Sequence, residues 1–220
     1  GRYVNNVWSP QFGIPSSVNP VSNTITIAGV NYFNGDYTAG ESSEFDQLLI
    51  FYSRNATSGG NWNDPNSWST DQSLQHAGPP AGTAPSFNSV VIASGHTITA
   101  TGNGLNSPTA QINGTLNIQN FNGHNFGTVT GTGKLYLTPN GSNQYTFPGG
   151  NFAAFVNAGG GTVEYYNNGA AALLPTQATY NNIAFSGSGI KNLANTDLLI
   201  NGNLDIQAGA MVNASNKNVN

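Results

Sequence analysis

A short pattern, in which a turn residue shortly precedes an apolar, polar, apolar triplet, recurs through the second half of the chain. The two clearest copies, residues 112–118 (Ile-Asn-Gly-Thr-Leu-Asn-Ile) and 200–206 (Ile-Asn-Gly-Asn-Leu-Asp-Ile), agree at five of seven positions. The turn residues of the six copies are Asn88, Gly114, Gly133, Gly161, Asn181 and Gly202. Successive copies therefore lie 19 to 28 residues apart.

Repeats of roughly 20 to 30 residues are typical of solenoids, in which each coil buries its apolar face against its neighbours. Alternation of apolar and polar residues indicates strands, because successive side chains of a strand point to opposite faces. The sequence therefore predicts an all-β fold, a parallel β-solenoid (β-helix) of about six coils. A β-sandwich with Asn-Gly hairpins would have similar turn residues, and the uneven repeat length is compatible with it.

The composition and pattern of the sequence change twice along the chain. Residues 1–55 contain strand-like runs and we expect them to be the C-terminal part of a preceding β-sandwich-like domain. Residues 56–87 are rich in Gly and Pro and contain Trp62 and Trp68. They are predicted to form a junction and a cap, because an open solenoid end exposes unpaired strand edges. Residues 88–220 are the repeats, and we expect the array to be truncated at the C-terminus, as a piece of a longer protein.

Charged residues make up only 6% of the chain, against about 25% in an average protein. Five Lys and Arg residues and a net charge of −4 leave no basic stripe to neutralise phosphates, so nucleic acid is not an expected partner. No run approaches the roughly 18 apolar residues of a membrane span, so membrane insertion is not expected. The absence of Cys excludes disulfides.

One segment carries a resemblance to a known family. Residues 60–71 (Gly-Asn-Trp-Asn-Asp-Pro-Asn-Ser-Trp-Ser-Thr-Asp), a Gly-Pro-rich arm and residues 90–99 resemble the start of β-helix modules in very large surface proteins. These proteins are exported by the type IX secretion system of gliding bacteria, and residues 200–210 look like their coil repeat. The resemblance covers about residues 56–220. It implies an extracellular, cell-surface adhesin associated with gliding motility, whose neighbouring modules belong to the same polypeptide.

Because β-helices often host polysaccharide lyases, we searched the repeats for catalytic groups. Such an enzyme needs clustered carboxylates and a basic residue. Glu164 and Asp205 occupy the same strand position two coils apart, about 9 to 10 Å, on the predicted outward face. That separation suits inverting carboxylates, but isolated outward acids are usually solvated. We therefore assign no catalytic residue and expect a non-enzymatic protein.

Metal ligands are sparse in the sequence. The three histidines are His76, His96 and His124. Two of them on neighbouring coils would still lack a third ligand, so they are interpreted as turn or surface residues and no metal site is predicted. An acidic group precedes the repeats, at Asp36, Glu41, Glu44 and Asp46. These acids have no EF-hand or RTX spacing, so Ca²⁺ is only a weak possibility and no cofactor is expected.

Aromatic side chains are the best candidates for a carbohydrate site, because their faces stack on apolar sugar faces. The candidates are Tyr136, Tyr166, Trp62 and Trp68. The register predicts Tyr136 and Tyr166 on the outward face, whereas the tryptophans are better explained by packing in the cap. We expect a stiff, secreted spacer that attaches a polar face to glycans or solid surfaces. The alternatives are a carbohydrate-active enzyme, with catalytic groups in loops, and a spacer without ligands.

Overall fold

The computed structural model of the chain consists of two compact units, Gly1–Gln47 and Leu48–Asn220. In the second unit the structure describes residues 49–54, 59–78, 80–194, 196–214 and 216–220; in the first it describes the backbone of five strands. β1 (Arg2–Val4) pairs antiparallel with β2 (Val7–Ser9) and β5 (Asp36–Tyr37). β3 (Ser17–Asn19) pairs antiparallel with β4 (Thr24–Thr26). The predicted sandwich-like domain before residue 55 stays a prediction.

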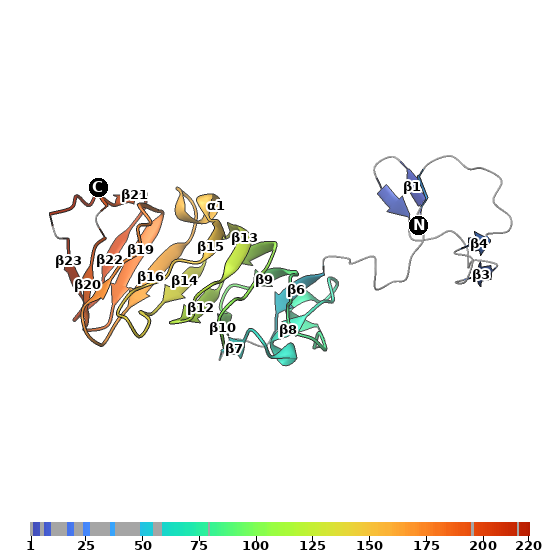
Figure 1. Cartoon of the computed structure of the whole chain (residues 1–220), viewed down its shortest axis with the longest axis horizontal. Coiled ribbons are helices and arrows are strands. Elements are labelled where there is room, and N and C mark those ends of the chain that lie inside the picture. The colour runs from blue at the N-terminus through green and yellow to red at the C-terminus, as the bar shows by residue number, and fades with distance from the viewer. Residues whose placement is uncertain are drawn as a thin grey trace. The chain divides into compact units, whose positions relative to one another are not determined.

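The second unit is a parallel β-solenoid of about six coils, in which strands of successive coils lie side by side (Figure 1). Its largest sheet has seven strands, every neighbouring pair of which is parallel. These strands are β7 (Gly60–Asn61), β10 (Thr97–Thr99), β12 (Thr115–Gln119), β14 (Lys134–Leu137), β16 (Thr162–Tyr166), β19 (Asn182–Ser186) and β22 (Leu204–Ile206).

A six-stranded sheet forms a second wall of the solenoid. Its strands, in spatial order, are β15 (Gly149–Asn151), β13 (Asn125–Thr130), β11 (Thr109–Ile112), β9 (Ser89–Ile92), β6 (Ile50–Ser53) and β8 (Trp68–Ser69). The smaller parallel sheets are β17 (Ala172–Leu173) with β20 (Ile190–Asn192) and β23 (Met211–Asn213), and β18 (Thr179–Tyr180) with β21 (Leu199–Ile200). The parallel ladders exclude the sandwich of hairpins for these repeats.

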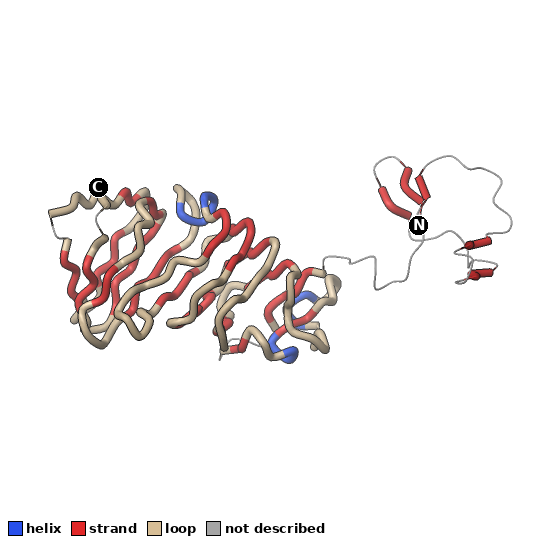
Figure 2. Tube along the Cα trace, viewed as in Figure 1, coloured by secondary structure: helices blue, strands red, loops and turns tan. Residues whose placement is uncertain are grey.

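Helix is scarce in this unit (Figure 2). The helical segments are η1 (Pro65–Ser67), η2 (Gln75–Ala77) and α1 (Ala153–Val156). Among the described residues, no helix has the length and apolar character needed to cross a membrane.

The predicted register is confirmed for five of the six copies. Thr115 pairs with Lys134, Lys134 with Thr162 and Thr162 with Asn182, each one residue after its turn residue. The prediction for Asn88 is wrong, because the strand that follows it, β9, lies in the six-stranded sheet. Thr97–Thr99 occupies the expected place in the seven-stranded sheet. Both strands of that coil contain β-branched residues and bury alternate side chains, so the sequence pattern alone could not distinguish the two sheets.

Inward side chains form continuous apolar rows through the coils. One row consists of Leu116, Leu135, Val163 and Ile183, all at most 1% exposed. Burying each such side chain stabilises the fold by about 1.5 to 3 kcal/mol relative to exposing it. The next member of the row, Leu204 in β22, is 45% exposed because no further strand covers it.

The solenoid begins before the predicted boundary at residue 88. β6 pairs in parallel with β9, and β7 pairs in parallel with β10, so both large sheets extend back into residues 50–61. β6 likewise belongs to the second compact unit, although residues up to 55 were expected to be part of the preceding domain. β8 then runs antiparallel to β6 and is the last strand of its sheet.

Asparagine and aspartate side chains tie successive coils together at their corners. Oδ1 of Asn103, Asn168, Asn182 and Asp197 accepts a backbone N–H from the following coil, at 2.9 Å in each case. Amide side chains of successive coils also pair directly, as where Asn213 Nδ2 donates to Asn192 Oδ1. The abundance of Asn therefore serves mainly to satisfy backbone donors where the chain turns.

The longest step between copies holds an inserted segment, residues 138–161. It includes β15 and α1, and a hollow of about 360 Å³ beside them is lined by Phe147 and Phe152. Even so, β14 and β16 on either side of it pair without a register shift, from Lys134 with Thr162 to Leu137 with Tyr165. The uneven repeat length therefore reflects the different lengths of chain that connect one strand of the seven-stranded sheet to the next.

Candidate functional site

The outer face of the seven-stranded sheet brings the sequence-predicted tyrosines together. Tyr136 in β14 is the register partner of Glu164 in β16, and Tyr166 lies two residues beyond Glu164. The rings of Tyr136 and Tyr166 stack with centroids 5.7 Å apart and planes 29° apart. Both tyrosines are half-buried, whereas Tyr165 between Glu164 and Tyr166 is fully buried in the core, as the register predicts.

Hydrogen bonds hold this pair in place. The backbone carbonyl oxygen of Tyr166 accepts a hydrogen bond from the Tyr145 hydroxyl at 3.1 Å, and the Tyr166 hydroxyl accepts one from Asn168 Nδ2. Burial, followed by the charge of Glu164, raises the pKa of Tyr136 to about 12. The phenol of Tyr136 is therefore uncharged at neutral pH and is available as a hydrogen-bond donor.

Glu164 is the acid that the sequence analysis expected to be solvated, and this expectation is wrong. Its side chain is buried at 5% exposure and makes an ion pair with Lys134, whose Nζ lies 2.5 Å from Oε2. Ser186 donates a hydrogen bond to the other carboxylate oxygen, also at 2.5 Å. Lys134 reaches diagonally from the preceding coil, a contact that the confirmed register would have allowed us to predict.

Asp205 does sit where the register put it. Glu164 pairs with Ala184, and Ala184 pairs with Asp205, so the two acids are two strands apart, about 9 to 10 Å. Asp205 is exposed, in contrast to Glu164. The two carboxylates therefore differ in environment, and Glu164 is already engaged by two partners.

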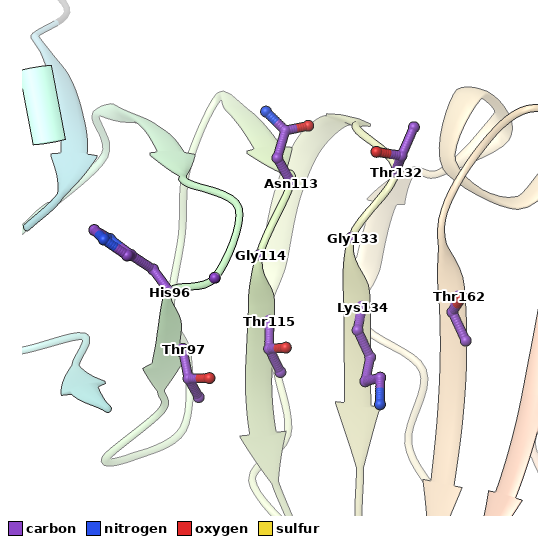
Figure 3. A pocket seen from close by; sticks show the side chains of 10 residues that line it. His96, Thr97, Asn113, Gly114, Thr115, Thr132, Gly133, Lys134 and Thr162 are labelled. Carbon is purple, nitrogen blue, oxygen red and sulfur yellow. The ribbon is translucent and has the colours of Figure 1, made fainter. Parts of the chain in front are cut away.

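A groove of about 310 Å³ lies over the same sheet, at the starts of its strands, and neither Tyr136 nor Tyr166 lines it. One side is a row of outward side chains from four neighbouring strands: Thr97, Thr115, Lys134 and Thr162 (Figure 3). Gly95, Gly114 and Gly133 also line it. A Cβ at Gly114 or Gly133 would run into backbone carbonyl oxygens of the preceding coil, so the close stacking of the coils beneath the groove requires glycine at these positions.

Trp62 and Trp68 do not belong to this face. They are 1% and 0% exposed, and their rings meet edge to face at 5.4 Å. Trp68 Nε1 donates to the backbone oxygen of Trp62 at 2.8 Å, and Trp62 also packs against Phe126 in the core. Rings buried to this degree offer no face to a sugar, so we retain only Tyr136 and Tyr166 as candidate binding residues.

The three histidines lie in two separate environments. The rings of His76 and His96 are 5.8 Å apart, and Ser53 Oγ hydrogen-bonds to His96 Nδ1 at 2.8 Å. Burial, with a contribution from His76, lowers the pKa of His96. His124 instead stacks on Phe126. The interpretation of the histidines as turn or surface residues is wrong for His124, which is 3% exposed.

His124 predicts a loss of stability in acid. Its Nδ1 accepts a hydrogen bond from the Leu105 backbone N–H at 3.2 Å, and burial, opposed in part by a hydrogen bond to the Phe121 backbone, lowers its pKa. In the unfolded chain His124 becomes protonated near pH 6.5, whereas in the folded chain it stays neutral to lower pH. The free energy of unfolding therefore falls as pH drops below about 6.5. Urea unfolding at a series of pH values measures this fall.

The matched variant is His124→Gln, which keeps an acceptor for Leu105 N–H but does not titrate. We expect it to reduce the pH dependence below about pH 6.5. If the free energy of unfolding of this variant falls in acid as steeply as that of the parent chain, His124 is not the cause of the fall.

Lys191 is a buried charge that the sequence analysis did not identify. It is 0% exposed, and its Nζ donates to the carbonyl oxygens of Gly187 at 2.6 Å and Asn167 at 3.4 Å. Burial lowers its pKa. Lys191 pairs with Ala172 and Val212, so it occupies an inward position of its ladder. No sequence signal distinguishes such a lysine from a solvated one, because its neighbours are determined by the pairing of β20 with β17 and β23.

Metal ligands do not cluster in the part of the chain that the structure describes, where no group of three or more His, Asp or Glu residues meets the geometry of a metal site. Of the acidic group, Glu41, Glu44 and Asp46 lie outside the described residues, as does the side chain of Asp36. Weak Ca²⁺ binding by these acids therefore stays a prediction.

No protein-family model, curated protein or solved structure matches this chain.

Proposed function

We propose that the chain is a structural and adhesive module of a large extracellular cell-surface protein. The solenoid is the stiff spacer, and the outer face of its seven-stranded sheet attaches to glycans or solid surfaces. The observation that supports this most is the stacked pair Tyr136 and Tyr166 on a face of otherwise polar side chains. Neutral aromatic rings beside hydroxyl and amide groups suit carbohydrates, whose rings have apolar faces and hydroxyl edges.

The low charge of the chain supports the same class of partner. A net charge of −4 with five basic residues gives little attraction to phosphates or anionic lipids. Lys134, the base nearest the tyrosines, is already paired with Glu164. The resemblance of residues 56–220 to modules of type IX-secreted adhesins of gliding bacteria adds a cell-surface location and neighbouring modules of the same polypeptide to this proposal.

The chain is proposed to be non-enzymatic. A glycosidase of the inverting type needs one free carboxylate to activate water and a second to protonate the leaving group. Glu164 is held by Lys134 and Ser186, which suits a role in binding the coils together better than proton transfer. The competing function is a carbohydrate-active enzyme, and the same binding experiment separates the two.

The experiment is a screen of the full chain on a glycan and polysaccharide array, followed by Tyr136→Ala and Tyr166→Ala. Each variant is expected to weaken glycan binding about tenfold, because each removes a stacking surface. Phe87→Ala is the control, since Phe87 is an aromatic residue 69% exposed outside this face. Melting temperatures check that the variants fold.

The outcomes separate three functions. Saturable binding that depends on the tyrosines, without cleavage products, supports the adhesive module. Cleavage that disappears in the double variant Glu164→Gln, Asp205→Asn would instead establish an enzyme. Absence of binding across the array would leave a spacer without ligands.

A further inference from the structure

The groove runs across the strands of the seven-stranded sheet, because its row of side chains comes from four neighbouring strands. Thr97, Thr115, Lys134 and Thr162 are register partners on β10, β12, β14 and β16. Neighbouring strands lie about 4.8 Å apart, so the row spans about 14 Å along the solenoid axis. Figure 3 shows these side chains projecting from successive strands on the same side. A ligand that uses the whole row must therefore be elongated and lie along the axis.

The groove is also uncharged as a whole. Among the described residues that line it, Lys134 is the one charged side chain, and Glu164 neutralises Lys134 from beside the groove. His96 is neutral at neutral pH, because burial lowers its pKa. The remaining polar groups, on Asn113, Thr97, Thr115 and others, are hydroxyls and amides. An anionic ligand would have to compete with Glu164 for Lys134, at the cost of leaving a buried carboxylate unpaired.

The tyrosine pair lies beyond this row on the same face, outside the lining of the groove. Tyr136 follows Lys134 by two residues on β14, and Tyr166 follows Thr162 by four on β16, so all four side chains point outward from the same two strands. The Tyr136 phenol, with its pKa raised to about 12, remains a donor. A ligand in the groove would thus meet hydroxyl groups, and it would reach the aromatic rings only where it extends past the row.

We propose that this groove binds a neutral, linear polysaccharide lengthwise, with successive sugar units against successive coils. The proposal rests on the glycan-binding function proposed above and specifies its ligand. Sugar units of a linear chain are comparable in length to the strand spacing, so the hydroxyl groups of Thr97, Thr115 and Thr162 meet equivalent positions along the chain. The paired Lys134 contributes a donor without making the groove cationic.

The test is calorimetric titration of the full chain with cello-, xylo-, manno- and laminari-oligosaccharides, from dimers to hexamers. Oligogalacturonates of the same lengths are the acidic comparison. At least one neutral series is expected to bind, with an affinity that rises with length and levels off once the sugar spans the four coils. The acidic series is expected to bind more weakly than the neutral one.

The key variant is Thr115→Val, Thr162→Val, which removes two hydroxyls and keeps the β-branched shape. It is expected to weaken the best neutral ligand about tenfold. The matched control is Thr128→Val, on the outer face of the six-stranded sheet, which is expected to change nothing.

Several results would overturn the proposal. If a glycan binds through Tyr136 but the double threonine variant behaves like Thr128→Val, the groove is not the site, although the adhesive function stands. The same holds if binding does not depend on sugar length, or if the acidic series binds more tightly. If no carbohydrate binds at all, the proposed function fails and this inference fails with it.

Discussion

Replacing Gly133 by alanine is expected to destabilise the solenoid by about 3 kcal/mol or more. Gly133 has no positive φ, so the effect does not come from backbone conformation. A Cβ at this position would meet the backbone of the preceding coil, namely the carbonyl oxygen of Gly114, the carbonyl carbon of Asn113 at 2.6 Å and the amide nitrogen of Gly114 at 2.8 Å. Backbone atoms of a paired strand cannot move aside without opening the ladder between β12 and β14.

The chain provides a matched control in Gly141→Ala. Gly141 also has no positive φ, and a Cβ there would meet nothing within 4 Å. Its replacement is expected to change the free energy of unfolding by less than about 0.5 kcal/mol. Urea unfolding followed by circular dichroism compares the two variants, and equal midpoints would show that the coils are not in the close contact described.

The second large effect is expected in alkali. Burial raises the pKa of Tyr145, Tyr165 and Tyr180, with the charge of neighbouring tyrosines adding to the rise at Tyr145 and Tyr165. Tyr165 and Tyr180 also share a hydrogen bond of 2.8 Å between their hydroxyls inside the core. These phenols stay protonated in the folded chain at pH values where the unfolded chain releases their protons.

The sign and size of the effect follow from this difference in proton binding. The unfolded state loses protons above about pH 10 and the folded state does not, so stability is complete below pH 10 and falls as pH rises. Each buried phenol contributes about 1.4 kcal/mol per pH unit, or about 4 kcal/mol per pH unit for three. Lys191 acts in the opposite direction, because its pKa is lowered, but one ammonium does not offset three phenols.

Unfolding free energies measured between about pH 9 and pH 11, together with tyrosinate absorbance, test this prediction. Tyr180→Phe and Tyr145→Phe are each expected to reduce the slope above about pH 10 by about a quarter to a third, since Tyr136, whose pKa is also raised, adds to the slope. A slope that neither variant changes would mean that other groups cause the alkaline unfolding.

Register was the part of the fold most accessible from the sequence. Gly114, Gly133 and Gly161 could be aligned because the alternation after each of them is a direct consequence of strand geometry. The alignment then placed Tyr136, Tyr165 and Tyr166 on the correct faces, and it placed Asp205 opposite Ala184. The prediction for Asn88 was wrong because each coil contains more than one strand with the same alternation, and only the sheet pairing distinguishes these strands.

Contacts between coils were harder to foresee. The ion pair of Lys134 with Glu164 joins residues 30 positions apart, and it depends on a lysine long enough to reach diagonally across the sheet. Burial of His124 and Lys191 depends on how the turns fold over them, which alternation does not describe. The groove was likewise not predicted, since it depends on how closely the coils stack at Gly114 and Gly133.

The inserted segment at residues 138–161 leads to a consequence for engineering. β14 and β16 pair in unbroken register on either side of it, and β15 within it pairs with β13, so the exposed turn at Gly141 and Ser142 is the part that can change length without altering either ladder. A foreign peptide or small domain grafted at this turn should therefore be displayed without disturbing the pairing of the coils. The paired strands maintain the fold, whereas the exposed turn can take up residues that bind a new partner.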